Sequence, residues 1–224
     1  MEHFFKLAYK TDEKTRIFGE NFVKRNINKC KIIYNNKEHQ IKEFFEEIDK
    51  NYKPGETIKF KLRIFHNILN LSGMFFNCYG LLSMKDDSKV NKEQVKAKLK
   101  YGLSISKKEE KKPFKIIDIN RMFYGCESLI SIPNISDWNM ENVTNLFGLF
   151  YECESLISIP DISKWNMKKV TNMNYIFYRC NQLSSIPDIT NWNVENIFYN
   201  FELVYKYDNY LRILGEKFVN KNIN

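Results

Sequence analysis

Apolar residues recur through the middle of the chain at a fixed spacing of 27 residues. Cys126, Cys153 and Cys180 are separated by this spacing, and three tryptophans and three prolines repeat with them. A constant period of this length is typical of an array in which each unit buries its apolar side by stacking on the next. The pattern therefore predicts a scaffold with an extended surface, and it indicates a reaction only weakly.

Within one period the apolar spacings fit neither a helix nor a strand throughout, so each unit is predicted to be a composite coil. The unit that begins at Asp118 is predicted to have one helical turn over 122–125, with Asp118 as its N-cap. A short strand over 129–132 and an irregular loop held by Trp138 are expected to follow. An earlier copy contains Cys78, and its distance from the next copy is one period plus a 21-residue insertion.

The region before the repeats has a different pattern. Apolar and basic residues alternate over 58–64, which predicts a half-buried strand. Residues 31–34 and 38–41 flank Asn35–Asn36, a sequence that favours a hairpin turn, and apolar residues over 42–48 have helical spacing. Together these elements predict a small α+β cap that covers the apolar end of the array.

The C-terminal residues 201–224 align with 5–28, and 14 of the 24 positions are identical. We interpret this as a duplicated module whose second copy stops early, as in a fragment of a longer array or in a shortened working protein. The tail is expected to fold back near Trp192 or to pair with another chain, which would allow self-association. The predicted organisation is a remnant tail of a preceding module (1–14), the cap (15–65), a solenoid (66–200) with a Lys-rich insertion at about 85–112, and the truncated copy (201–224).

The residues that define the repeat also suggest a family. Cys-x-x-Leu-x-x-Ile-Pro, Trp-Asn, Val-Thr-Asn and Met-Phe-x-x-Cys follow one another over about 68–193. This succession resembles the BspA-like leucine-rich-repeat surface proteins, in particular their subtype with repeats of 26 to 27 residues. The resemblance implies a right-handed solenoid that binds proteins or host surfaces. The expected fold class is thus α+β, a short leucine-rich-repeat-like solenoid with a small α+β N-terminal cap.

The formal net charge of +8 is unevenly distributed. Residues 85–115 contain 11 lysines and 5 acidic residues, a local excess of +6. A solvated loop is one interpretation, and electrostatic binding to nucleic acid or an anionic surface is the alternative function that we keep. The N-terminus has no signal-peptide pattern and the chain has no apolar stretch long enough to span a membrane. An intracellular location is therefore expected from the sequence, whereas the family resemblance points to a surface role.

We expect no catalytic, cofactor-binding or metal-binding residues. The histidines at 3, 39 and 66 lie outside the regular repeats, and four of the five cysteines share one repeat position, which is typical of buried reduced thiols. Neither a metal-ligand spacing nor a phosphate-binding loop is present in the sequence. The predicted function is accordingly non-enzymatic, namely protein–protein interaction with an unidentified protein partner, and nucleic acid is not expected as the main partner.

Repeated polar positions suggest where a partner is recognised. The serine on each predicted strand and the asparagine after each tryptophan recur unchanged, so a structural role within the stack is expected for them. The polar residues that follow each cysteine and precede each tryptophan vary from unit to unit. These variable positions are the predicted partner-binding residues: Glu127, Asp137, Glu154, Lys164, Asn181 and Asn191.

Overall fold

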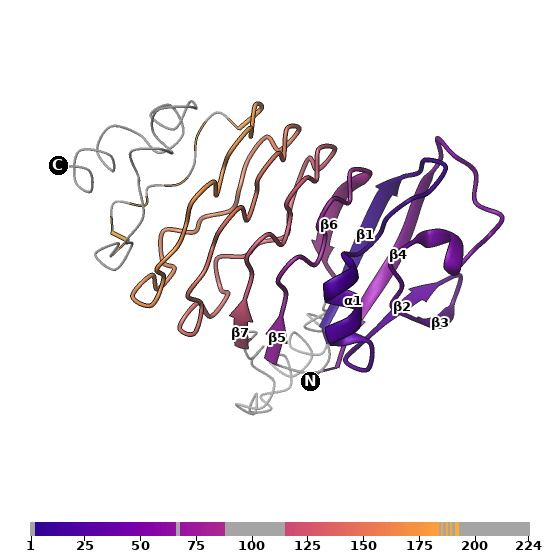
Figure 1. Ribbon diagram of the computed structural model, residues 1–224, viewed down its shortest axis with the longest axis horizontal. Helices are drawn as coiled ribbons and strands as arrows, with labels where there is room; N and C mark the ends of the chain where they lie inside the picture. The colour runs from indigo at the N-terminus through magenta and orange to yellow at the C-terminus, as the bar shows by residue number, and fades with distance from the viewer. Residues whose placement is uncertain are drawn as a thin grey trace, which may run out of the picture.

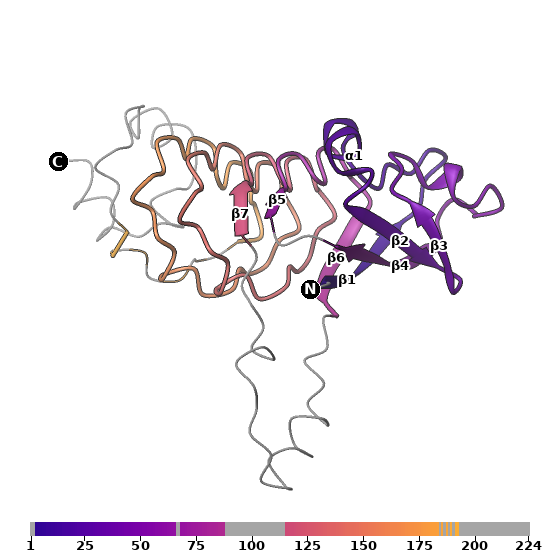
Figure 2. The same ribbon diagram turned by 90° about the horizontal axis from the view of Figure 1, so that it is seen from below.

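A sheet-containing cap stands at one end of a row of chain coils that lie side by side (Figure 1). The computed structural model describes residues 3–65, 68–87 and 115–183, together with 185, 187, 189, 191 and 192. Seen at 90° to the first view, the cap closes one end of the row (Figure 2). Residues 88–112 of the predicted Lys-rich insertion (85–112) and the copy at 201–224 lie outside the described residues, and so do the predictions made for them, whereas Lys85 and Asp86 belong to a strand.

The cap contains an antiparallel sheet of five strands in the order β3-β2-β4-β1-β6. These strands are β1 (His3–Lys10), β2 (Cys30–Tyr34), β3 (Lys37–Gln40), β4 (Thr57–Ile64) and β6 (Leu81–Asp86). The remaining elements are the helix α1 (Glu20–Asn26), a 3-10 turn (Phe45–Glu47), and the short parallel pair β5 (Ile68–Asn70) and β7 (Lys115–Asp118). β6 belongs to the first repeat unit, so the cap and the repeats share one sheet.

Two of the predictions for the cap are confirmed. β4 covers the predicted alternating strand, with its apolar side chains buried. β2 and β3 form the predicted hairpin, and both turn residues, Asn35 and Asn36, have left-handed φ angles of 48° and 61°. Two left-handed residues are what a tight two-residue hairpin turn requires, and asparagine tolerates that conformation well.

Other parts of the cap differ from prediction. The helix expected over 42–48 is only the 3-10 turn, and the helix that the structure does contain, α1, was not predicted. α1 is seven residues long and buries only Phe22 and Asn26, which is too few positions to give a clear helical pattern. Residues 3–10, interpreted from sequence as part of a remnant tail, form β1, which pairs with β4 on one edge and β6 on the other.

The expected fold class, an α+β leucine-rich-repeat-like solenoid, is wrong. The regular secondary structure of the described residues is mainly the five-stranded antiparallel sheet with one helix. The helical turn expected over 122–125 is a non-helical turn, and the strand expected over 129–132 is reduced to a single bridge between Ser83 and Ser131.

Hydrogen bonds between units explain why the turn is not helical. The N–H groups of Arg121, Phe123 and Gly125 donate to carbonyls of the following unit, at 2.9, 3.0 and 2.7 Å. A helix would need the same N–H groups for carbonyls four residues earlier. In addition, Arg121 and Gly125 have left-handed φ angles of 52° and 70°, which interrupt any right-handed helical run.

We number the repeat units as coils by the cysteine that each contains: coil 1 (Cys78), coil 2 (Cys126), coil 3 (Cys153) and coil 4 (Cys180). Asparagine and aspartate side chains bend the chain at three corners of coils 2 and 3. Each accepts a hydrogen bond from the N–H two residues later, as expected for an Asx turn. The acceptors are Asp118, Asn134, Asn139, Asn145, Asp161 and Asn166. A structural role is thus found for Asn139 and Asn166, which follow two of the tryptophans, but their bonds lie within a coil and not between coils as expected, and Asn193 lies outside the described residues.

A ladder of phenylalanines runs through the core of the stack. Phe75, Phe123, Phe150 and Phe177, one per coil, stack with centroid separations of 5.5 to 5.7 Å. Phe18 of the cap stacks on Phe75 at 5.7 Å, so the cap continues the same core. The coils are thus held by apolar contact along a common axis, as expected for units that cannot bury their apolar sides alone.

The cysteine ladder lies beside the phenylalanines. Cys126, Cys153 and Cys180 are buried, and each thiol donates to the carbonyl of a phenylalanine in the preceding coil, at 3.2, 3.2 and 3.0 Å. Burial raises the pKa of the Cys126 and Cys153 thiols well above the usual value. The predicted burial of these cysteines is confirmed.

These thiols are expected to react slowly in the native protein. The reactive species is the thiolate, which the raised pKa suppresses at Cys126 and Cys153, and the core excludes the reagent from all three thiols. Labelling with a maleimide at neutral pH should modify Cys126, Cys153 and Cys180 at least ~100-fold more slowly than in denaturant, because reaction requires opening of the stack. Mass spectrometry of the labelled peptides measures both rates. Equal rates in the two states would contradict the buried ladder.

Candidate interaction surface

Aromatic side chains also form a ladder on the outside of the stack. Phe76, Tyr124, Tyr151 and Tyr178 each follow a core phenylalanine and are half-buried. Successive rings stack at centroid distances of 5.0, 4.1 and 4.7 Å. Because adjacent residues of the turn point to opposite sides, the repeated aromatic pair contributes one ring to the core and one to the surface.

A second set of rings and two arginines widen this ladder. Tyr175 meets Tyr178 and Phe147 edge to face, at 5.7 and 5.6 Å. Arg121 lies over the Phe147 ring at 4.8 Å, and Arg179 lies over Tyr178 at 5.8 Å. We call the combined surface the aromatic strip: Phe76, Arg121, Tyr124, Phe147, Tyr151, Tyr175, Tyr178 and Arg179.

Three residues of this strip have a strained, left-handed backbone. Arg121, Tyr175 and Arg179 have φ angles between 52° and 56°, a region that large side chains avoid at a cost of roughly 1 kcal/mol each. The equivalent positions of other coils include glycine, at Gly73, Gly125 and Gly148, which adopts this conformation freely. The large side chains are therefore not needed for the turn itself, and their presence suggests a role on the surface.

Electrostatics keep Tyr151 of the strip neutral, and an arginine lies toward each end of the strip. Desolvation, followed by a hydrogen bond with Tyr124, raises the pKa of Tyr151 well above its usual value, so its hydroxyl stays protonated. Arg179 pairs with Glu152 at 2.9 Å, and that contact raises the pKa of Arg179. Arg121 lies over its ring in an exposed position at the other end.

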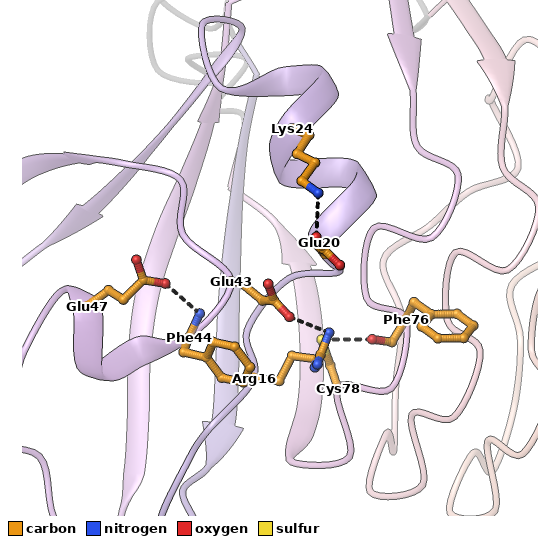
Figure 3. Close-up of polar contacts among 8 residues, drawn as sticks. All are labelled: Arg16, Glu20, Lys24, Glu43, Phe44, Glu47, Phe76 and Cys78. Carbon is orange, nitrogen blue, oxygen red and sulfur yellow. Dashed lines mark hydrogen bonds and ion pairs between the residues drawn. The ribbon is translucent and has the colours of Figure 1, made fainter.

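A cleft of about 240 Å³ adjoins the strip where the cap meets coil 1. Phe76 and Arg121 of the strip line it together with Arg16 and Arg25 of the cap. Arg16 points from the cap toward coil 1, where Figure 3 shows it between Glu43 and Phe76, and its guanidinium pairs with Glu43 at 2.6 Å. The cleft therefore extends the aromatic strip with a polar, mainly basic end.

The predicted partner-binding residues lie elsewhere. Asp137, Lys164 and Asn191 form one exposed row, and the residues after the cysteines form another, in which the carbonyls of Glu127 and Glu154 accept bonds from the next coil at 3.1 and 3.2 Å. The exposed fraction is high at every predicted position except Glu154, which is half-buried. None of the six belongs to the aromatic strip: Glu127, Asp137, Glu154, Lys164, Asn181 and Asn191.

The sequence contained a signal for the aromatic strip that the prediction missed. Phe-Phe, Phe-Tyr, Phe-Tyr and Phe-Tyr end at positions 76, 124, 151 and 178, in register with the cysteines. The Met-Phe-x-x-Cys motif described from sequence includes only the first ring of the pair and leaves the second unassigned. A repeated pair of large aromatics cannot place both rings on one side of a tight turn, which would have indicated an aromatic surface.

Two further observations concern the described residues. Among residues 3–65, 68–87 and 115–183, no cluster of three or more histidine, cysteine or acidic side chains could hold a metal ion. Within the same part of the chain, no helix is long and apolar enough to cross a membrane.

These features define a repeat protein built from stacked coils behind a sheet-containing cap. Residues 103–212 match the family described as "Mycoplasma protein of unknown function, DUF285". No curated protein and no solved structure matches the chain. The matched range includes coils 2 to 4, which carry most of the aromatic strip.

Proposed function

We propose that this repeat protein is a non-enzymatic scaffold that binds another protein through the aromatic strip. The observation that carries the proposal is the set of strained, non-glycine residues on that surface. Tyrosine, phenylalanine and arginine are the residues enriched in the energetic centres of protein interfaces. The resemblance to BspA-like surface proteins also supports a protein or host surface as the partner.

The strip is suited to binding because it is held rigid before a partner arrives. Its rings are attached to turns whose N–H groups bond the next coil, as at Arg121 and Gly125. Stacking on both neighbours restricts the Tyr124 and Tyr151 rings further. A surface ordered in advance loses little conformational entropy on association, which favours affinity.

A capture experiment with two matched baits tests this proposal. In the strip bait, Arg121→Ala and Arg179→Ala remove both exposed cations of the strip. In the control bait, Asp137→Ala and Lys164→Ala change two of the residues predicted from sequence. We expect the strip bait to bind the captured partner at least ~30-fold more weakly, since each lost contact at an interface centre costs more than ~1 kcal/mol. The control should bind like the unchanged protein.

The same experiment discriminates the alternative functions. Capture is compared at ~100 mM and ~500 mM salt, because phosphate neutralisation weakens steeply with salt whereas a shape-matched protein contact does not. Binding that survives in the strip bait but disappears at high salt would assign the function to the Lys-rich insertion. A loss confined to the control bait would instead favour the variable positions predicted from sequence.

A further inference from the structure

The outer face of the cap sheet gathers lysines in a way that the fold does not require. In the sheet register Lys6 of β1 lies opposite Lys61 of β4 on one side and opposite Lys85 of β6 on the other. Lys59 is two residues from Lys61 on the same face. Like charges directly opposite one another destabilise a sheet, so this row opposes folding.

One carboxylate only partly neutralises the row. Asp87 contacts Lys6 at 2.6 Å and Lys61 at 2.9 Å. Lys59 and Lys85 have no carboxylate partner among the described residues. Four lysines and one carboxylate together leave a local charge of +3, which an anion could neutralise.

These lysines line a shallow pocket that is partly open to solvent. The cavity has a volume of about 580 Å³, which is within the range of sites that hold a small organic ligand. Besides the four lysines, its lining includes the apolar Ala8 and Ile33. Asn35 and Asn36 of the hairpin turn also line the cavity and provide uncharged hydrogen-bonding groups.

We propose that this pocket binds a small molecule that carries a chain of phosphate groups. The local excess of positive charge favours a multiply charged anion such as a triphosphate, and lysine binds phosphate as a point charge from any direction. A carboxylate ligand would be better matched by the planar fork of arginine, and the pocket is lined by lysines. The pocket is on the outer face of the sheet and is independent of the aromatic strip.

Calorimetric titration with inorganic triphosphate and with a nucleoside triphosphate tests the proposal. Saturable binding of both probes is expected at ~100 mM salt. Lys59→Gln with Lys85→Gln should raise the dissociation constant ~10-fold or more, since these lysines are free to contact the anion. The control, Lys50→Gln with Lys53→Gln, removes the same charge outside the pocket and should leave the dissociation constant within ~2-fold. Equal weakening by the two pairs, or no saturable binding, would overturn the proposal.

The probes and a further variant sharpen the result. Equal affinity for inorganic triphosphate and the nucleoside triphosphate would show that the pocket recognises the phosphates alone. Tighter binding of the nucleoside triphosphate would show that its nucleoside also contacts the pocket, at Ala8 and Ile33. Asp87→Asn removes the competing carboxylate and should tighten binding ~5-fold. Unchanged or weaker binding in this variant would overturn the proposal. Binding of an oligonucleotide, when neither triphosphate binds, would also overturn the proposal.

Discussion

Replacing Trp165 with alanine is expected to lower the free energy of unfolding by about 3–5 kcal/mol, the usual loss for deleting a large buried aromatic. Only 4% of Trp165 is exposed, and its ring stacks on Trp192 with centroids 6.2 Å apart. Its indole N–H also donates to the Ile135 carbonyl at 3.0 Å. The substitution therefore opens a cavity and removes one of the two hydrogen bonds that the Ile135 carbonyl accepts, the other coming from the Trp138 N–H.

Denaturant unfolding of three variants measures this effect and separates its parts. Trp165→Phe keeps a ring but removes the indole N–H, so an intermediate loss of ~0.5–1.5 kcal/mol is expected from the lost hydrogen bond, since the Ile135 carbonyl keeps its bond from the Trp138 N–H. Ile157→Ala is the control, since Ile157 is 58% exposed and should cost less than ~1 kcal/mol. If Trp165→Ala lowered the free energy of unfolding no more than the control does, the indole would not join the coils.

The period of the sequence was sufficient to predict what lies inside the stack. The cysteines, tryptophans and first aromatic of each pair share fixed offsets, and an offset that is apolar in every copy must face a common interior. Trp165 and Cys153 are accordingly buried. Local alternation was equally informative in β4, because a two-residue period assigns one side of a strand to the core.

The backbone path within a coil could not be predicted in the same way. The apolar spacing and the capping residue Asp118 suggested a helical turn. The conformation that forms, however, depends on which carbonyl each N–H group bonds. Phe123 donates to Leu149 in the next coil, and this contact becomes visible only when the coils are stacked. The left-handed angles at Arg121 and Glu152 were hidden for the same reason, since neither residue is a glycine.

The two candidate sites were missed for different physical reasons. The aromatic strip depends on the second ring of each pair, as at Tyr151, and an apolar period alone does not say which of two adjacent rings faces outward. The basic pocket depends on register: the alternation in β4 places Lys61 on the outer face but does not show that β1 brings Lys6 opposite it. Residues 3–10 had been interpreted as a remnant tail, so this neighbour could not be foreseen.

Gly80→Ala is expected to destabilise the protein by about 3 kcal/mol by separating the cap from coil 1. A Cβ at Gly80 would overlap the carbonyl oxygen of Lys10, and backbone cannot move aside as a flexible side chain would. The N–H of Lys10 donates to the Gly80 carbonyl at 2.8 Å, so the two chains already lie in close contact. The added methyl must push β1 away from the first coil and weaken the shared sheet.

Gly55→Ala provides a matched control for this last substitution. Gly55 has a φ of 88° and open space around its Cβ position, so alanine there costs only backbone strain, ~1 kcal/mol. Gly80 is not among the positive-φ glycines, so its cost comes from the collision. Hydrogen exchange at the Lys10 amide should accelerate in Gly80→Ala and stay unchanged in Gly55→Ala. If Gly80→Ala cost less than Gly55→Ala and left that amide protected, the cap and coil 1 would not be joined at this contact.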